Sequence, residues 1–188
     1  EKGKGDGVFI TTTGLGVVVE GVEVGGDRAR PGQVILLSGT IGDHGIAILS
    51  KRESLEFETE IVSDTAALHG LVADMLNVAP GLSVLRDPTR GGLAATLNEV
   101  AQQSHVGMRL EESAIPLRAD VKAACELLGL DPLYVANEGK LIAICHEDDA
   151  DRLLAVMRAH PLGRDASRIG IVTADTNNLV QMRTGFGG

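Results

Sequence analysis

The stretch RDPTRGGLAATLNEVA, from Arg86 to Ala101, is the most informative part of this sequence. The apolar run LSVL precedes it, and Pro88 interrupts any helix there because proline fixes φ and has no N–H. Gly91 and Gly92 then introduce a segment with the apolar spacing of a helix. We therefore predict a short strand, a tight turn and a helix, which is the unit of a sheet covered by helices.

The turn in this stretch has two interpretations. Paired glycines let the backbone approach a ligand closely, and the first turn of a helix offers unpaired N–H groups to a phosphate. Asp87, Thr89 and Arg90 would then hold a metal ion and a phosphoryl group. The same residues also fit an ordinary strand-to-helix turn with an N-cap. The segment is neither the G-x-G-x-x-G fingerprint nor a Walker A loop, so spacing alone leaves both interpretations open.

The composition indicates an enzyme-like domain of the α/β or α+β class. The 188 residues suffice for one domain, or for one domain with a fragment of another. Of these residues 44% are apolar, mostly aliphatic, and 24 are glycines, which suits a core with many tight turns. The formal net charge of −9 argues against binding to nucleic acid, since the phosphates would be repelled.

The two cysteines, Cys125 and Cys145, are predicted to be buried apolar residues. Neither belongs to a C-x-x-C pair, so the sequence indicates no zinc site and no disulfide framework. The sequence shows no signal peptide, transmembrane run or lipidation motif, and we expect a cytoplasmic protein that does not bind membranes.

Apolar periodicity and turn residues predict an α+β fold with a mixed sheet covered by helices, because some strands follow one another without a crossover helix. Ser63 or Asp64 would cap the second helix, and the last two strands would form a closing hairpin. The predicted strands are 8–21, 34–38, 82–85, 107–113, 141–145, 166–174 and 177–185, and the predicted helices begin near 46 and 64 and cover 93–104, 119–128 and 148–160.

Three glycine-containing loops of mixed charge follow or precede predicted strands: SGTIGDHG (38–45), RDPTRGG (86–92) and ANEGK (136–140). If their strands are neighbours, the loops gather at one edge of the sheet, where ligands commonly bind.

Each of four side chains in these loops could have either a chemical role or a purely structural one. Asp43 and His44 could serve in metal binding or proton transfer, or simply be solvated or cap the backbone. Glu138 could be a base or metal ligand, or an exposed turn residue. Lys140 could contact a phosphate, or be solvated.

These loops, in this order, resemble the hydrogenase expression/formation protein HypE family over essentially the whole chain. That family shares a superfamily with aminoimidazole ribotide synthetase, selenophosphate synthetase and thiamine-monophosphate kinase. The resemblance implies the C-terminal, AIR-synthase-like domain of such a protein. It rests on EKGKGDGVFITTTGLG (1–16), SGTIGDHGIAIL (38–49), ADMLNVAPGL (73–82), RDPTRGGLAATLNE (86–99) and LLGLDPLYVANEGKL (127–141).

The resemblance implies a role in [NiFe]-hydrogenase maturation. HypE proteins receive a carbamoyl group from HypF on a C-terminal cysteine and dehydrate it to a thiocyanate, converting ATP to ADP and phosphate. The cyanide then passes to iron on a HypC–HypD complex. Phosphorylation makes the amide oxygen a good leaving group, and a base must remove the amide protons. ATP and Mg²⁺ are the implied cofactors.

The resemblance also implies site residues, position by position. Asp87, Thr89, Arg90, Gly91 and Gly92 match the segment that binds nucleotide phosphates, with Asp87 as a metal ligand.

The remaining matches lie in three other segments. Lys2 and Lys4 match a linker beside the nucleotide, and Lys140 matches a cofactor-binding position. Glu138 and His44, together with Arg90, are the implied catalytic residues, without an assignment of the base.

The chain departs from the family pattern at both ends. Residues 1–32 correspond to a remnant of an N-terminal ATP-binding domain with its linker, and residues 33–188 to the C-terminal domain. The acceptor cysteine and most of the first domain, through which family members form homodimers, have no counterpart. We therefore expect this fragment to be inactive alone, with the apolar segment 8–20 prone to association. The alternatives are a docking module for the maturation partners and another ATP-dependent superfamily member.

Overall fold

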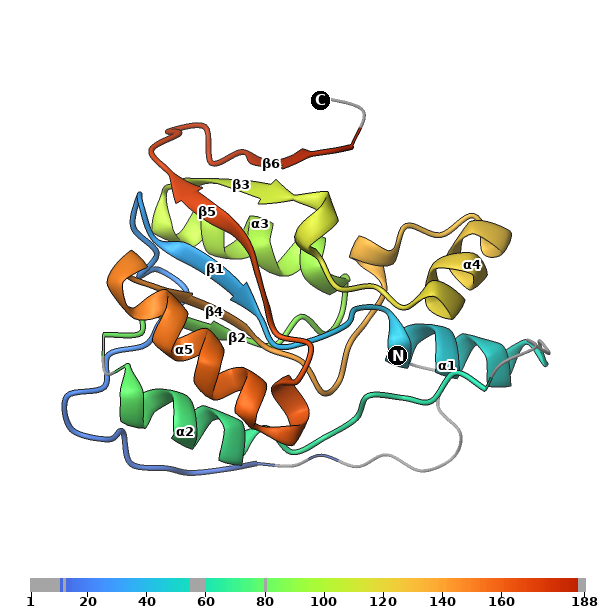
Figure 1. Ribbon diagram of the computed structural model, residues 1–188, viewed down its shortest axis with the longest axis horizontal. Coiled ribbons are helices and arrows are strands. Elements are labelled where there is room, and N and C mark those ends of the chain that lie inside the picture. The colour runs from blue at the N-terminus through green and yellow to red at the C-terminus, as the bar shows by residue number, and fades with distance from the viewer. Residues whose placement is uncertain (1–10, 12, 55–59, 80, 186–188) are drawn as a thin grey trace.

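The computed structural model describes residues 11, 13–54, 60–79 and 81–185, which form a six-stranded mixed sheet with helices on both faces (Figure 1). Its order is β2-β4-β1-β5-β3-β6, with all neighbours antiparallel except the parallel pair β3 and β6. The predicted α+β class with a mixed sheet is confirmed. The strands are β1 (Val34–Leu37), β2 (Val84–Arg86), β3 (Gly107–Glu111), β4 (Ile142–Cys145), β5 (Ser167–Thr173) and β6 (Val180–Arg183).

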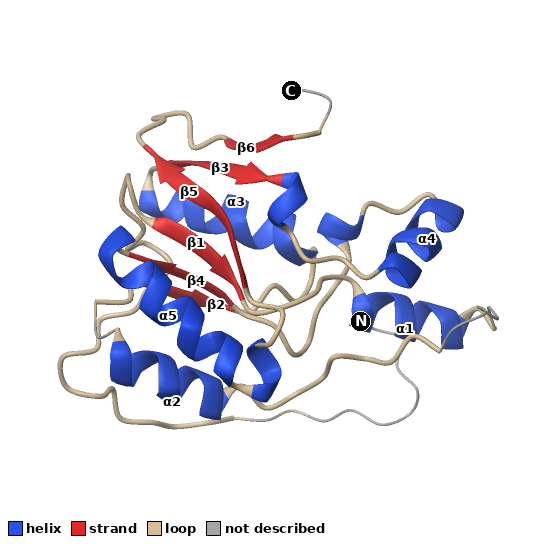
Figure 2. Cartoon of the chain, viewed as in Figure 1, coloured by secondary structure: helices blue, strands red, loops and turns tan. Residues whose placement is uncertain are grey.

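The α-helices of the described part lie in three places relative to the sheet (Figure 2). Helices α2 and α5 pack together on one face, α3 lies on the other, and α1 and α4 pack against each other beside the sheet. None of the described helices is long and apolar enough to cross a membrane. They are α1 (Asp43–Arg52), α2 (His69–Val78), α3 (Gly92–Ser104), α4 (Ala119–Leu128) and α5 (Glu147–Ala159).

Strand β1 shows why the sheet needs helices on both sides. Ile35 and Leu37 point into the core under α3, whereas Val34 and Leu36 point into the core under α2 and α5. All four side chains are buried, which explains an apolar run without polar alternation. Burial of each contributes about 1.5–3 kcal/mol to folding.

Both cysteines are buried, as predicted. Cys125 packs with Ile46 and Val121 in the small core between α1 and α4, and Cys145 lies in the core under α5. Burial raises the pKa of the Cys125 thiol, and raises that of Cys145 to about 11. Both therefore stay protonated and unreactive at neutral pH.

The predicted closing hairpin is wrong. Strands β5 and β6 follow each other in sequence, but β3 lies between them and pairs with both. The connection runs through a turn in which the Asp175 carboxylate accepts the Asn177 N–H, and the Leu179 carbonyl then accepts the Met108 N–H. Local turn signals could not show that a third strand separates the two.

Two further predictions are corrected. Residues 13–21 of the predicted first strand form no strand, and residues 1–10 and 12 lie outside the described part of the chain. The second helix begins at His69, so neither Ser63 nor Asp64 caps it. Both residues instead belong to a loop whose side chains bond to other parts of the chain.

Candidate functional site

The three glycine-containing loops meet at one edge of the sheet, because β4 lies antiparallel between β1 and β2. Loop 38–45 leaves the carboxyl end of β1, and loop 86–92 leaves the carboxyl end of β2. Loop 136–140 leads into the amino end of β4. Antiparallel pairing brings these three strand ends to the same side.

Asn137 joins the three loops. Its side-chain oxygen accepts the Gly42 N–H at 2.8 Å, and its amide nitrogen donates to the Pro88 carbonyl at 3.0 Å. The side chain is almost completely buried, so these bonds are shielded from water. The sequence analysis did not single out Asn137, because the burial that gives this amide its role is visible only in the structure.

A cavity of about 710 Å³ opens where the loops meet. His44, Thr89, Arg90 and Glu138, which were predicted from the three different loops, line it together. Arg52, at the end of α1, also lines it and had not been predicted. Within the described residues, Arg52 and Arg90 have no ion-pair partner, so the cavity presents two guanidinium groups, an imidazole and one carboxylate. Ile48, Leu49, Gly45 and Ala136 complete its walls.

Residues 63–65 hold the imidazole of His44. The Ser63 hydroxyl lies 2.8 Å from His44 Nδ1, and Thr65 Oγ1 lies 3.4 Å from the same atom. Because Nδ1 is engaged there, Nε2 is the ring nitrogen left for a ligand. The sequence interpretation missed this segment, since it treated Ser63 as a helix cap.

Lys140 does not line the cavity. Its ammonium group lies 3.2 Å from Asp64 Oδ2, and only 13% of the lysine side chain is exposed. Asp64 Oδ1 accepts the Glu138 N–H at 3.0 Å. The predicted phosphate contact of Lys140 is therefore replaced in this structure by a buried ion pair.

Asp43 lies beneath the cavity rather than in its wall. The Thr40 hydroxyl donates to its carboxylate, and Arg118 Nε lies 3.7 Å from its other oxygen. Burial raises the pKa of Asp43 above its ordinary value, although Thr40, Lys140 and Arg118 act in the opposite direction. The structure gives Asp43 a place at the start of α1 and no direct access to a ligand in the cavity.

Gly91 and Gly92 serve the packing of the turn. Both have positive φ, at 79° and 64°. A Cβ at Gly92 would lie 2.4 Å from the Leu133 carbonyl oxygen, so only glycine lets the start of α3 contact residues 133–135. Positive φ accounts for glycine at both positions and the backbone contact for glycine at 92, while phosphate binding by this turn stays a prediction.

Of Asp87, Lys2 and Lys4, which were predicted to bind the metal ion or to lie in the linker beside the nucleotide, the structure describes only Asp87. Asp87 is exposed, and the described residues contain no group of three or more His, Cys, Asp and Glu side chains that could hold a metal ion. Mg²⁺ is usually bound by one or two carboxylates together with substrate phosphates, so Asp87 alone supplies only part of such a site, and its role as a metal ligand stays a prediction. Lys2 and Lys4 lie outside the described residues.

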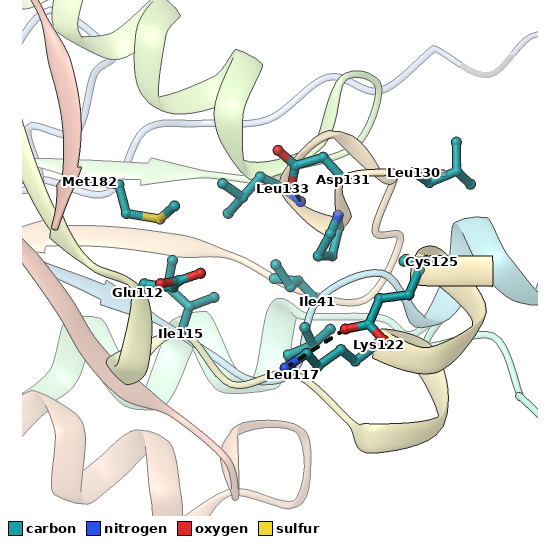
Figure 3. Close-up of a pocket in the computed structure, with 12 residues that line it drawn as sticks. Ile41, Glu112, Ile115, Leu117, Lys122, Cys125, Leu130, Asp131, Leu133 and Met182 are labelled. Carbon is teal, nitrogen blue, oxygen red and sulfur yellow. Dashed lines mark hydrogen bonds and ion pairs between the residues drawn. The ribbon is translucent and has the colours of Figure 1, made fainter. Parts of the chain in front are cut away.

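A second cavity, of about 310 Å³, lies beside α4 and is lined mainly by apolar side chains (Figure 3). Ile41, Leu117 and Met182 contribute to its wall, and Lys122 pairs with Glu126 at its rim at 3.9 Å. None of the predicted site residues lines it, and its charged lining residues, Glu112, Lys122, Glu126 and Asp131, come with no guanidinium or imidazole group. The first cavity is therefore the candidate site.

Comparisons with known proteins support the resemblance to the HypE family that the sequence indicated. The family model "AIR synthase related protein, C-terminal domain" matches residues 30–182. Carbamoyl dehydratase HypE of Cupriavidus necator is 71% identical over 188 residues, which is 100% of this chain and 54% of that protein.

Two crystal structures are similar to this fold. The hydrogenase maturation protein HypE in complex with ATP has a TM-score of 0.86 and 47% identity, covering 92% of this chain and 53% of that one. A HypE–HypF complex also gives 0.86, with 44% identity over 90% of this chain and 55% of that one. The chain thus spans about half the length of the relatives it matches, and the division at residue 32 stays a prediction.

Proposed function

The chain belongs to the family of AIR synthase related proteins, C-terminal domain, and from this premise we propose that it contributes the acid–base face of a carbamoyl dehydratase in hydrogenase maturation. The predicted likeness to HypE is confirmed by the comparisons. The proposed reaction converts an S-carbamoyl cysteine and ATP into an S-cyano cysteine, ADP and phosphate. The single observation that carries the proposal is the joint cavity of His44, Arg90 and Glu138.

The arrangement suits a dehydration driven by phosphoryl transfer. The amide oxygen leaves as phosphate after taking the γ-phosphoryl group of ATP, and the nitrogen loses two protons as the C≡N bond forms. Arg90 offers planar donors that fit phosphoryl oxygens, in a cavity where a second guanidinium adds positive charge. This local charge attracts an anion to a chain whose formal net charge is −9.

Glu138 is the residue that we assign as the base. Its backbone N–H is fixed by Asp64, while within the described residues its carboxylate has no hydrogen-bond or ion-pair partner. It is therefore held in place and available to take a proton. His44, with Nδ1 engaged by Ser63, offers Nε2 to the same cavity and can bind the substrate amide or relay its proton.

The proposed cofactors and partners follow from the relatives. ATP is supported by the HypE crystal structure that contains it, and HypF by the crystal structure of the HypE–HypF complex. A HypC–HypD complex as cyanide acceptor, a homodimer and Mg²⁺ bound with the help of Asp87 are further parts of the proposal. Arg90 and Thr89 would contact the nucleotide phosphates from this side of the cavity.

Replacing Glu138 tests the proposed chemistry. In the full-length protein, Glu138→Gln should leave carbamoylation intact and slow the loss of water from the modified cysteine by about 100-fold or more. Mass spectrometry of the cysteine-bearing peptide measures both steps. Glu126→Gln, which removes an exposed carboxylate at the rim of the other cavity, should dehydrate at the normal rate. Full activity of Glu138→Gln would exclude Glu138 as the base.

A further inference from the structure

We propose that Ser63 and Asp64 act together as positioning residues that fix His44 and Glu138 relative to each other across the cavity. The inference rests on the proposed function, because it assigns a role to two residues that contact side chains or backbone of the proposed reaction site. Neither residue lines the cavity itself. Both act through contacts with residues that do.

Ser63 positions the imidazole. Its hydroxyl is 2.8 Å from His44 Nδ1 and also lies 2.8 Å from Thr65 Oγ1. The Thr65 N–H donates back to Ser63 Oγ at 3.2 Å, which fixes the hydroxyl on the backbone of its own loop. A ring whose Nδ1 is bonded in this way has one preferred orientation and one preferred tautomer.

Asp64 positions loop 136–140 through three consecutive residues. Its Oδ1 accepts the Glu138 N–H at 3.0 Å, and its Oδ2 lies 3.2 Å from Lys140 Nζ. Between them, a Cβ at Gly139 would lie 1.7 Å from the Asp64 carbonyl oxygen, so the two backbones are in direct contact. This contact requires glycine in the ANEGK segment.

The burial of this carboxylate indicates a purpose other than stability. The Asp64 side chain is only 4% exposed, and a buried ion pair is often no more stabilising than apolar residues of the same volume. Such a pair does fix a single geometry when one of its members also accepts a backbone N–H. Since Ser63 and Asp64 are adjacent, one rigid loop sets the positions of the imidazole and of the proposed base at once.

The first test measures position without turnover. In protein labelled with ¹⁵N-histidine, Ser63→Ala should move the imidazole nitrogen resonances of His44 and change its tautomer ratio. His160, whose Nδ1 accepts the Leu162 N–H at 3.1 Å, should be unchanged in the same spectrum. An unchanged His44 spectrum would overturn the role of Ser63.

The second test separates the two contacts of Asp64. Asp64→Asn keeps an acceptor for the Glu138 N–H and removes the charge opposite Lys140, whereas Asp64→Ala removes both. Hydrogen exchange at the Glu138 amide should be about 10-fold faster or more in Asp64→Ala and change less in Asp64→Asn. Equal exchange in all three proteins would overturn the role of Asp64. If Asp64→Ala does not fold, the Glu138 amide of Asp64→Asn should still exchange faster than in the unaltered protein, because the contact with Lys140 is lost, and equal exchange would overturn the role of Asp64.

Activity of the full-length protein gives the functional readout. Ser63→Ala and Asp64→Ala should each lower kcat for dehydration by about 10-fold or more with KM for ATP unchanged, because orientation and not nucleotide binding is lost. Asp64→Asn should recover part of that loss, and Asp74→Asn on α2 should match the unaltered protein. Unchanged kcat in both alanine variants would overturn the positioning role. If the unaltered protein shows no dehydration, the proposed function fails, while the histidine and amide measurements still decide the geometry.

Discussion

Asp43 is a buried carboxyl that directly precedes a residue of the candidate site. It begins α1, directly before His44, and its carboxylate is bonded to Thr40 and faces Arg118. A negative charge at a helix N-terminus is favoured by the helix dipole, but burial penalises it. The net result is a raised pKa for Asp43, which makes this residue sensitive to acid.

Asp43→Asn should therefore change how stability depends on pH. A carboxyl whose folded pKa lies above its ordinary value near 3.8 binds protons more readily in the folded state, so its contribution to stability falls as pH rises through that window. The free energy of unfolding of Asp43→Asn relative to the unaltered chain should rise from about pH 4 upward and become constant once the Asp43 carboxyl is ionised in both states. Urea denaturation at a series of pH values measures this, and a difference independent of pH would contradict it.

At the scale of elements, the turn before α3 depends on backbone packing. Gly92 has a φ of 64° and lies against the carbonyl groups of residues 133–135, which lead into loop 136–140. The strand–turn–helix unit was predicted, but its packing partner was not, because residue 133 is distant in sequence. The same contact brings Thr89 and Arg90 to the cavity.

Comparing Gly129 with Gly92 distinguishes the cost of a positive φ from the cost of a steric collision at Cβ. Gly129, at the end of α4, has nearly the same φ of 66° but open space around it. Gly129→Ala should cost about 1–2 kcal/mol through φ alone. Gly92→Ala should cost at least about 1 kcal/mol more, since its Cβ would also collide with Leu133. Chemical denaturation of both variants measures the difference, and equal losses would show that the backbone contact does not matter.

At the scale of the whole molecule, segment 15–19 stands apart from the three hydrophobic cores. Leu15, Val17, Val18 and Val19 are exposed, with fractions from 64% to 101%, and the segment has no strand partner among the described residues. A contiguous apolar segment of this kind favours association, unlike apolar residues scattered singly.

Replacing both Val17 and Val18 with lysine should reduce self-association of the chain at high concentration. Charge on an extended apolar segment opposes pairing between chains. Sedimentation velocity measures the distribution of species. Leu127→Lys, at an isolated exposed residue that is 77% exposed on α4, serves as the control and should change nothing. If the double variant associates as the unaltered chain does, segment 15–19 is not the surface involved.

Features set by short-range pattern were predictable. Helix α4 has the predicted bounds, 119 to 128, and ends at Gly129, because apolar spacing and a glycine C-cap act within one or two turns. Strand β1 and the burial of both cysteines follow likewise from local apolar content. The pairing of β3 with β6 and the loop position of Ser63 depend on contacts between distant residues, and there the predictions failed.

The α+β class, most helices and strands, the three loops and the resemblance to HypE could all be predicted from the sequence. That His44, Arg90 and Glu138 share one cavity, while Lys140 is paired with Asp64 inside the protein, became visible only in the fold. The physical reason is that a side chain's role depends on which distant groups desolvate it and bond to it, as Asn137 and Asp64 do here. Gly92 illustrates the same point, since only the fold shows that its backbone lies against the carbonyl groups of residues 133–135.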